Sequence, residues 1–386
     1  MLPAPSCQKP PPHPIRPQAS RPRGSTSGRA SRAGMKRRQL LRHAIALPAA
    51  LPGLASSRAL AAIQGGPRVA FGIAAQTRQL LTDPGFRDAV VRECDILTPE
   101  LEMKWGFVEE NQGSANLAPA DQMSNFARRF GKRMHGHALI WHKSTPDWAA
   151  SQMMTNPDWR IIDAFIQRIV PRYAGVVESW DVVNEPFADN GRPDGLRVSP
   201  FLTAFGPDYI RRAFERARSL APTAKLYLND YGFLYDDSES EARRTAALRL
   251  LEALKKHSVP VDGLGIQGHV DLERTGTFRQ ETFARFLKSV ADMGCAIRIS
   301  EFDVREHETA IPVEQRDALV ADATAAVLDV AADCPALVSV TCWGLSDRYS
   351  WLPLPSETAG LNRGLPLDSD LRQKPMYRAL MKALRR

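Results

Sequence analysis

The chain has 386 residues, of which 44% are hydrophobic and 24% are charged. It can bury a full hydrophobic core, and its length suits one large α/β barrel or two ordinary domains. The net charge of +8 is concentrated at the N-terminus, because residues 1–61 hold eleven Lys or Arg and no Asp or Glu. Subtracting these eleven leaves −3 for residues 62–386, so the charge pattern gives no support to a nucleic-acid partner.

Residues 1–61 are predicted to be a leader outside the folded domain. They contain ten of the 29 prolines, and residues 1–34 have no apolar period, which predicts disorder. The stretch MKRRQLL begins at Met35, which we consider as the true start of the protein. Its paired arginines precede an apolar stretch at residues 44–54 and a small-residue site at residues 59–61. These three zones are typical of an export signal.

The paired arginines followed by two leucines resemble a twin-arginine signal, which exports folded proteins. The apolar stretch is short and interrupted by Pro48, Pro52 and Gly53, so we expect no stable membrane anchor. The expected location is therefore the periplasm or the cell exterior. A basic disordered tail is the alternative interpretation of this segment.

The cysteines do not form a metal-binding pattern. Cys7 lies in the leader, and the other four lack a C-x-x-C pair. We therefore expect buried thiols and no zinc site, although four cysteines allow three disulfide pairings. These four are Cys94, Cys295, Cys334 and Cys342.

From residue 62 onward, apolar β-branched runs alternate with helical patterns. The expected strands span residues 69–75, 96–100, 133–141, 179–185, 225–230, 263–269, 296–303 and 339–344. The expected helices span residues 120–130, 158–173, 207–220, 239–257, 279–293, 313–334 and 375–386. Eight strands alternating with helices predict an α/β fold with a single (β/α)8 TIM barrel in residues 62–386. A doubly wound open sheet is the alternative, but no G-x-G-x-x-G follows the first strand.

The predicted strands end in polar residues, and in such a barrel the active site is built at these ends. Glu185 follows an apolar run in the fourth strand, and Glu301 follows another in the seventh. Two carboxyls facing each other across the barrel mouth suit glycoside hydrolysis, in which one donates a proton and the other attacks or activates water. Asn184 is placed to bind a sugar hydroxyl, and His269 with Asp303 to form a chain that keeps Glu301 charged.

Seven stretches in order resemble the signatures of glycoside hydrolase family 10, the retaining endo-β-1,4-xylanases. They are TPELEMKW (98–105), HGHALIWH (135–142), WDVVNEPF (180–187), YLNDY (227–231), GIQGH (265–269), ISEFD (299–303) and WGLSDRYSW (343–351). The resemblance extends over nearly all of residues 69–380 and touches seven predicted strand ends.

The resemblance implies a role for each matching position. Glu185 corresponds to the general acid/base and Glu301 to the nucleophile, with their carboxyls about 5 to 5.5 Å apart. Asn184 corresponds to the residue that binds the 2-hydroxyl of the −1 sugar, and Gln267 and His269 to partners of the nucleophile and of that sugar. Asn229 and Tyr231 match positions toward the leaving group. The glycone-binding positions are Glu100, Lys104, His137, Trp141, Trp343 and Trp351, with the tryptophans as stacking platforms rather than core residues.

One position departs from the family pattern. Leu101 follows Glu100 where the family has an asparagine that binds the −2 sugar. Leucine has no polar side-chain atom, and a lost hydrogen bond costs about 0.5 to 1.5 kcal/mol. We therefore expect activity to survive with weaker binding at −2.

The expected function is retaining hydrolysis of internal β-1,4 bonds in xylan by a monomer without a cofactor or metal. Glu185 is expected to have a raised pKa, because Glu301 is a like charge nearby. The first alternative is a related retaining glycosidase acting on cellulose, mixed-linkage glucan or mannan. Another is a metal-dependent barrel amidohydrolase, suggested by His135 and His137 on one strand face. A non-catalytic carbohydrate-binding barrel would be expected to have lost one of the two acids.

Overall fold

The strands of the folded unit form a closed parallel barrel. The computed structural model describes residues 69–188, 192–307, 310–352 and 362–385, so the predicted leader and its signal lie outside the described residues. The strands are β1 (Ala70–Ala75), β2 (Ile96–Pro99), β3 (Arg133–Gly136), β4 (Ile140–Trp141), β5 (Val177–Asn184), β6 (Lys225–Asp230), β7 (Gly263–Ile266), β8 (His269–Asp271), β9 (Ala296–Arg305) and β10 (Leu337–Cys342).

The barrel order follows the chain from β1 through β2, β3, β5, β6, β7 and β9 to β10, and β10 also pairs with β1. All of these pairings are parallel. The two short strands β4 and β8 pair with β5 and β9 respectively. The predicted eight-stranded (β/α)8 barrel is therefore confirmed.

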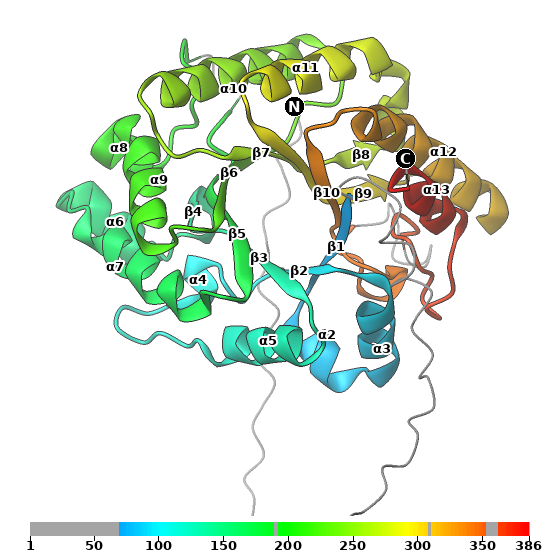
Figure 1. Cartoon of the computed structure of the whole chain (residues 1–386), viewed down its shortest axis with the longest axis horizontal. Coiled ribbons are helices and arrows are strands. Elements are labelled where there is room, and N and C mark those ends of the chain that lie inside the picture. The colour runs from blue at the N-terminus through cyan, green and yellow to red at the C-terminus, as the bar shows by residue number, and fades with distance from the viewer. Residues whose placement is uncertain (1–68, 189–191, 308–309, 353–361, 386) are drawn as a thin grey trace, which may run out of the picture. The chain divides into compact units, whose positions relative to one another are not determined.

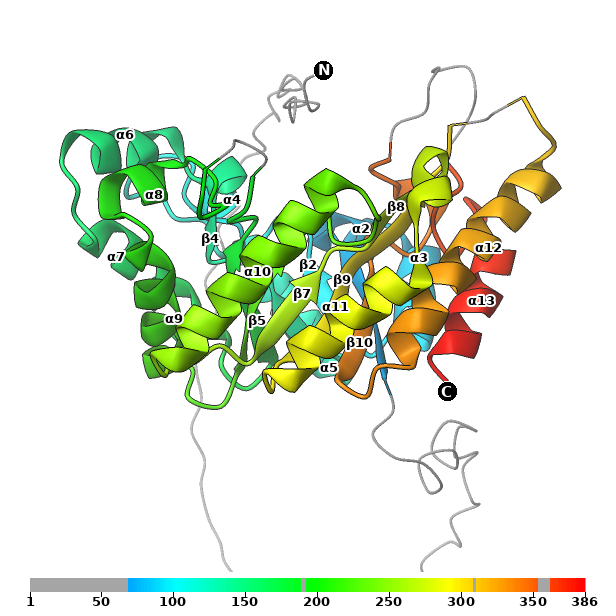
Figure 2. The ribbon, with the colours of Figure 1, turned by 90° about the horizontal axis from the view of Figure 1, so that it is seen from above.

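Helices surround the barrel between successive strands (Figure 1). They are α2 (Thr77–Thr82), α3 (Pro84–Glu93), α4 (Trp105–Val108), α5 (Ala118–Arg129), α6 (Asp147–Thr155), α7 (Arg160–Ile169), α8 (Pro200–Phe205), α9 (Asp208–Leu220), α10 (Ser238–Lys256), α11 (Gln280–Asp292), α12 (Val313–Ala332) and α13 (Pro375–Ala383). Four 3-10 turns are η1 (His142–Ser144), η2 (Pro171–Tyr173), η3 (Leu272–Thr277) and η4 (Asp347–Tyr349). Helices α10, α11, α12 and α13 run side by side across one flank (Figure 2).

The apolar patterns of the sequence explain how these layers pack. Strand β1 is buried at every position, as expected for a parallel strand covered on both faces. On α11, the buried residues Phe283, Phe286, Leu287 and Val290 recur at helical spacing and face the barrel. The core therefore lies between the barrel and its helices. None of the helices in the described ranges combines the length and apolarity needed to cross a membrane.

Three expected elements are interrupted in the structure. The strand expected at 133–141 leaves the sheet after Gly136 and resumes as β4, where Ile140 pairs with Val183. The strand expected at 263–269 breaks at Gly268, whose φ of +79° is a conformation that glycine adopts readily. The helix expected at 158–173 ends at Ile169, because Pro171 has no backbone N–H to continue it.

The cysteines in the described part of the chain are free thiols. Cys94, Cys295 and Cys342 are buried, as expected, whereas Cys334 is partly exposed.

Candidate active site

Glu185 and Glu301 lie at the same mouth of the barrel. Glu185 directly follows β5, and Glu301 lies within β9. Strands β6 and β7 separate these two strands in the barrel order, and both side chains are 5% exposed. The side chains that contact the two carboxyls from these neighbouring strands are Asn229 of β6 and Gln267, directly after β7. Each of the two buried acids therefore accepts a hydrogen bond from an amide side chain at the mouth of the barrel.

Two fixed donors hold the Glu301 carboxyl. Asn229 Nδ2 donates to Glu301 Oε1 at 2.8 Å, and His269 Nε2 lies 3.4 Å from Oε2. His269 Nδ1 lies 2.8 Å from Asp303 Oδ1, so the expected chain of contacts from Asp303 through His269 to Glu301 is present. Trp351 Nε1 donates to the other Asp303 oxygen at 2.7 Å. The second carboxylate is thereby oriented as well.

This chain sets the charge of His269. Burial lowers the pKa of the imidazole, but the neighbouring carboxylates of Asp303 and Glu301 outweigh burial and raise it to about 10. His269 is therefore an imidazolium at neutral pH. Both of its ring nitrogens then donate, one toward each carboxylate.

Asn229 is fully buried, and its side chain contacts the carboxyl of Glu301. Its amide nitrogen also donates to Asn184 Oδ1 at 2.7 Å, and its oxygen accepts from Ser300 Oγ at 2.6 Å. A Cβ atom at Gly265 would lie 2.2 Å from Asn229 Oδ1, so glycine on β7 leaves the room that this side chain needs. Asn229 therefore positions Glu301 and Asn184 from within the barrel.

Asn184 has one polar atom left over. Its oxygen is taken by Asn229, whereas its Nδ2 is buried and has no hydrogen-bond partner among the described residues. An unpaired buried donor costs free energy unless a ligand or water accepts from it. This donor is suited to a hydroxyl of a bound sugar.

Glu185 sits on a strained backbone with different partners. Its φ is +52°, which is uncommon for a residue other than glycine and recurs at functional sites. Its backbone N–H donates to the Asn229 carbonyl at 2.8 Å. Gln267 Nε2 donates to Glu185 Oε1 at 3.3 Å, and Lys143 Nζ lies 3.0 Å from Oε2. The side chain of Gln267 thus contacts the expected acid/base, whereas its backbone carbonyl accepts from the N–H of Glu301 at 2.8 Å.

The expectation of a raised pKa for Glu185 is wrong for this structure. Burial raises the pKa of this carboxyl, but the charge of Lys143 and hydrogen bonds from Trp141 and Lys143 together bring it below its ordinary value. The predicted rise in the pKa of Glu185 rested on repulsion from Glu301 alone, whereas Lys143 has the opposite effect on this pKa. Lys143 is therefore the largest of the influences that lower the pKa of Glu185 in the free protein.

The side of the site beyond Glu185 contains Lys143, Tyr231 and Arg197. Lys143 Nζ lies 5.8 Å from the centroid of the Tyr231 ring, and Arg197 Nη2 donates to the Tyr231 hydroxyl at 2.9 Å. Arg197 Nε also donates to the backbone carbonyl of Glu185 at 3.1 Å. Arg197 thus holds the Tyr231 side chain and also secures the backbone that presents Glu185.

Asp230, the residue before Tyr231, is a third buried acid. Burial raises its pKa to about 7 although Arg243 Nη1 lies 3.5 Å away. The backbone N–H groups of Phe187 and Tyr231 donate to its two oxygens at 2.9 and 2.7 Å. Asp230 therefore fixes the loops that follow β5 and β6.

Most of the expected glycone-binding residues come together on the other side. Lys104 Nζ lies 4.6 Å from the Trp141 ring centroid and 5.6 Å from that of Trp343. The His137 ring meets Trp343 edge-on at 5.1 Å. Trp141 is partly exposed, whereas Trp343 is 8% exposed. Trp343 therefore offers little of its ring face for a sugar to stack on.

Trp351 is the most open of the three expected platforms. It is 44% exposed and contacts the His269 ring edge-on at 5.2 Å. Glu100 lies at the end of β2 beside Lys104, and burial raises its pKa despite that ammonium. Leu101 is partly exposed at the same corner, where its backbone N–H donates to Glu102 at 3.2 Å. Leu101 therefore has no polar side-chain atom at the position where the family has an asparagine.

The two histidines that suggested a metal site share a carboxylate instead. His135 Nε2 and His137 Nδ1 lie 2.9 and 2.8 Å from the same Asp181 oxygen, and His135 Nδ1 lies 2.8 Å from Ser179 Oγ. Burial lowers the pKa of His135 to about 4, so this ring is neutral. Hydrogen bonding explains the pair without a metal ion.

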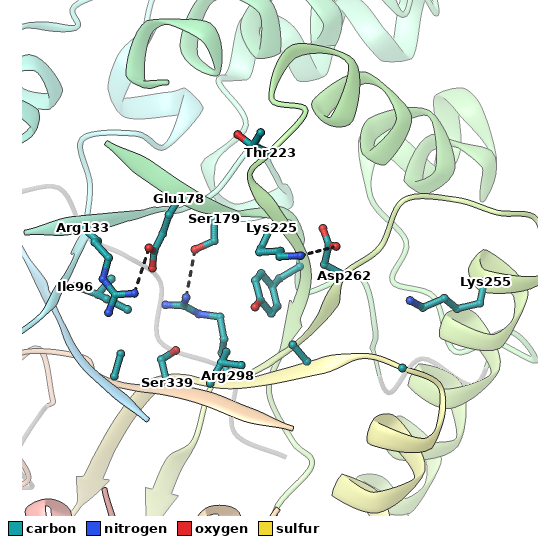
Figure 3. Close-up of a pocket in the computed structure, with 15 residues that line it drawn as sticks. Ile96, Arg133, Glu178, Ser179, Thr223, Lys225, Lys255, Asp262, Arg298 and Ser339 are labelled. Carbon is teal, nitrogen blue, oxygen red and sulfur yellow. Dashed lines mark hydrogen bonds and ion pairs between the residues drawn. The ribbon is translucent and has the colours of Figure 1, made fainter. Parts of the chain in front are cut away.

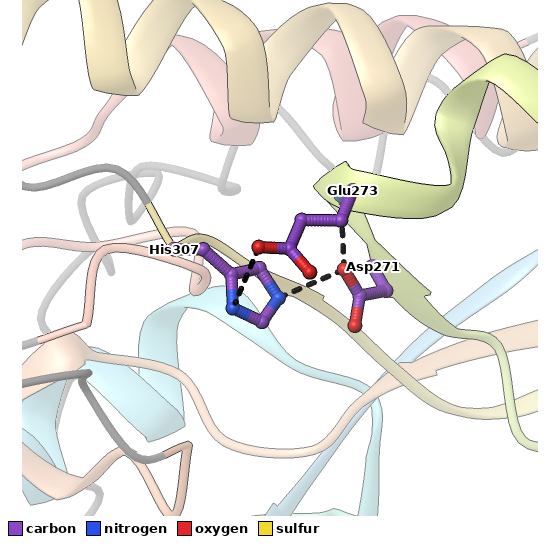
Figure 4. Close-up of side chains that lie close together, drawn as sticks. All are labelled: Asp271, Glu273 and His307. Carbon is purple, nitrogen blue, oxygen red and sulfur yellow. Dashed lines mark hydrogen bonds and ion pairs between the residues drawn. The ribbon is translucent and has the colours of Figure 1, made fainter.

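Another group of ligand-type side chains lies beyond β8. Asp271, Glu273 and His307 approach one another within 4.8 Å (Figure 4). His307 Nε2 lies 2.8 Å from Asp271 Oδ1, and Nδ1 lies 3.6 Å from Glu273 Oε1. Because these ion pairs account for the cluster, we assign no metal to it.

A cavity of about 530 Å³ opens at the opposite end of the barrel (Figure 3). It is lined by residues at the amino ends of strands, including Arg133, Lys225 and Arg298. The two carboxyls described above lie at the carboxyl ends. This cavity is therefore separate from the site that contains Glu185 and Glu301.

Several residues of the site were missed because no local pattern marks them. Lys143 follows the matching stretch HGHALIWH directly, and its contact with Glu185 could have been suspected from that position alone. Arg197 and Ser300 gave no signal in the sequence. Asp181 was not predicted as a residue of the site, because it lies inside the strand sequence WDVV.

Comparison with known proteins agrees with this geometry. The family model for glycosyl hydrolase family 10 matches residues 59–383. Endo-1,4-beta-xylanase A of Fusarium oxysporum is 32% identical over 340 residues, covering 86% of this chain and all of that protein. Endo-1,4-beta-xylanase B of Thermotoga neapolitana is 30% identical over 296 residues, covering 76% of this chain and 82% of that protein.

Solved structures show the same relationship. The crystal structure of xylanase 10B from Thermotoga maritima has a TM-score of 0.72 and 31% identity, covering 82% of this chain and 95% of that one. Xylanase 10B from Thermotoga petrophila, solved in complex with xylobiose, has a TM-score of 0.72 and 30% identity, covering 82% of this chain and 94% of that one. With the barrel and its paired buried carboxyls, these matches show that the chain is a glycoside hydrolase and belongs to glycosyl hydrolase family 10.

Proposed function

We propose that this protein hydrolyses internal β-1,4 bonds of xylan with retention of configuration at the anomeric carbon. The observation that carries the proposal is the unequal support of two buried carboxyls at one barrel mouth. Glu301 is held by Asn229 and His269, whereas Glu185 contacts a lysine that reaches solvent. Double displacement needs this inequality, since one acid must remain a fixed nucleophile and the other must gain and lose a proton.

In the first step, a Glu301 oxygen attacks the anomeric carbon of the −1 sugar and forms a glycosyl-enzyme bond. The bond from that carbon to the leaving oxygen breaks, and Glu185 gives its proton to the departing oxygen. The unpaired Nδ2 of Asn184 donates to the 2-hydroxyl of the same sugar. This hydrogen bond strengthens as the ring approaches its oxocarbenium-like transition state.

In the second step, Glu185 is a carboxylate and takes a proton from water. The water oxygen attacks the anomeric carbon, and the bond to Glu301 breaks with return of its electron pair to the carboxylate. Two inversions give net retention. A separation of about 5 to 5.5 Å between the carboxyls is the corresponding geometric prediction.

The glycone side binds the chain through a mixture of charge and flat rings. Trp141 and Trp351 offer faces to the CH groups of sugars, and Lys104 and Glu100 offer polar groups to hydroxyls. Leu101 cannot donate to the −2 sugar, so binding at that position depends on these neighbours. The relatives named above are xylanases, and one of them was solved with xylobiose, which favours xylan as the substrate class.

We further propose that residues 1–61 are an export leader of the twin-arginine type and that residues 62–386 are the catalytic domain. The paired arginines and the basic, proline-rich composition support this division. We also propose that the enzyme needs no cofactor, because two carboxyls suffice for double displacement, and that it acts as a monomer.

The proposed function is tested by incubating the purified full chain with xylan, cellulose and mannan in parallel. Release of reducing ends from xylan, abolished in Glu301→Ala, is the expected result, and NMR of the first product should show the β-anomer. Stronger release from cellulose or mannan would assign the chain to a related retaining glycosidase. The absence of release from all three would contradict hydrolysis and favour a barrel that only binds carbohydrate.

A further inference from the structure

Lys143 forms an ion pair with the carboxyl of the proposed acid/base. It lies in η1, two residues after Trp141, and its Nζ is 3.0 Å from Glu185 Oε2. The lysine side chain is 50% exposed, whereas the glutamate side chain is 6% exposed. A mobile surface cation is thus paired with the buried carboxyl that must act as a proton donor.

We propose that Lys143 is a positioning residue that holds Glu185 as a carboxylate in the free enzyme and is displaced when a sugar enters the leaving-group side. This inference rests on the proposed function, since it assigns a control element to the acid/base of that reaction.

The other groups around Glu185 cannot replace this cation. Burial, followed by the charge of Arg197, lowers the pKa of His142 to about 4, so its ring is neutral. Arg197 itself donates to the carbonyl of Glu185 and not to its carboxyl. Gln267 is uncharged, and the buried acid Asp230 contributes no positive charge. Among the described residues, Lys143 is therefore the cation in ion-pair contact with the Glu185 carboxyl.

The position of the ammonium explains why substrate would displace it. Nζ lies 5.8 Å from the ring centroids of both Trp141 and Tyr231, between an aromatic ring of the glycone side and one beyond Glu185. A sugar whose oxygen approaches Glu185 Oε2 needs the space that the ammonium fills. The lysine side chain is half exposed, so its ammonium can move into solvent. The buried carboxyl that it leaves avoids an unpaired charge by taking a proton.

Displacement changes the protonation of Glu185. With Lys143 in place, the ammonium keeps the pKa of Glu185 low. Once the ammonium leaves, burial is the largest remaining influence on the carboxyl and favours the neutral acid, which takes a proton from solvent. Substrate binding thus produces the protonated form of Glu185. A lowered pKa of Glu185 in the free enzyme is therefore compatible with its role as the proton donor.

The test compares Lys143→Met and Lys143→Arg with Lys256→Met, which removes an exposed lysine of α10 as a matched control. We would measure kcat/KM against pH for a xylo-oligosaccharide, whose leaving group needs the acid, and for an aryl xylobioside with a good leaving group. In kcat/KM, the basic limb reports the protonated acid of the free enzyme.

For the xylo-oligosaccharide, Lys143→Met should shift the basic limb to higher pH and raise kcat/KM above that limb about tenfold. Lys143→Arg should restore the parent profile, and Lys256→Met should match it. For the aryl substrate, the Lys143→Met profile should remain that of the parent. Lys143→Gln, which keeps a polar side chain without charge, should behave as Lys143→Met.

Unchanged basic limbs in both uncharged variants would overturn the inference, as would equal changes on both substrates, since these indicate a merely structural role. Inactivity of the parent chain on both substrates would instead refute the proposed function itself.

Discussion

The surroundings of Glu301 and Glu185 differ in kind. Glu301 lies within β9 and receives contacts from Asn229 on β6 and His269 on β8, side chains that are themselves hydrogen-bonded. Glu185 lies just beyond β5 on a backbone with positive φ, and its charged partner Lys143 comes from a 3-10 turn and is half exposed. One acid is built into the barrel, and the other is presented on its rim.

The difference follows from what each acid must do. A nucleophile has to remain ionised and aligned, and donors fixed by the sheet provide both at no cost of reorganisation. An acid/base must change protonation state twice per turnover, so a partner that can leave is an advantage. The fold thus provides a fixed environment for one acid and an adaptable environment for the other at the same mouth of the barrel.

The largest expected effect tests the fixed side of this comparison. Glu301→Gln removes the nucleophile, so it should lower kcat by at least about 10⁴-fold on xylan and on an activated aryl xylobioside alike. Thermal unfolding of the variant should resemble that of the parent, which would show that the loss is chemical. Retention of activity on the aryl substrate would assign the nucleophile to another residue.

Glu185→Gln should have a large effect that depends on the leaving group. The rate on xylan should fall about 10²- to 10⁴-fold, because no acid protonates the departing oxygen. An activated aryl xylobioside should still react with Glu301 and give a burst of phenol followed by slow turnover. Stopped-flow absorbance separates the two phases, and a burst as slow as the steady state would argue against an acid/base role.

Asn229→Ala should have an intermediate effect on both substrates, because it removes a buried hydrogen bond to the nucleophile. Such bonds to charged groups contribute about 1.5 to 3 kcal/mol, which corresponds to about 10- to 100-fold in kcat/KM. Asn125→Ala, an exposed position on α5, is the matched control and should match the parent. An Asn229→Ala enzyme as active as the parent would mean that Glu301 needs no support from β6.

The smallest expected effect concerns stability. The pKa of His269 is raised from 6.5 to about 10 in the fold, so its charge stabilises the native state fully below about pH 6.5 and progressively less as pH rises to 10. The stability lost in His269→Gln should therefore be greatest at acidic and neutral pH and diminish toward pH 10. Urea unfolding at several pH values measures this, and a pH-independent difference would contradict an imidazolium at this position.

Much of this protein could be predicted from local patterns. Apolar runs alternating with amphipathic segments specify the strands and helices, and the polar residues that end those runs specify the site. Glu185, Glu301 and His269 were identified in this way, as was the chain of contacts through Asp303. Elements with special backbone were less predictable: Gly268 interrupts one strand and Pro171 one helix, where extended or helical patterns continue across them.

Only the tertiary structure decided which partner each acid has. Gln267 was expected beside Glu301 and Asn229 toward the leaving group, yet their side chains contact Glu185 and Glu301 respectively. No pattern in the sequence indicated the contact of Lys143 with Glu185, so the direction of the pKa shift of Glu185 was predicted wrongly. Sequence determines which residues reach the mouth of the barrel, because strand length and polarity are local properties. Pairing depends on interstrand register and on distances of a few ångströms between side chains far apart in the chain, and these exist only once the barrel has closed.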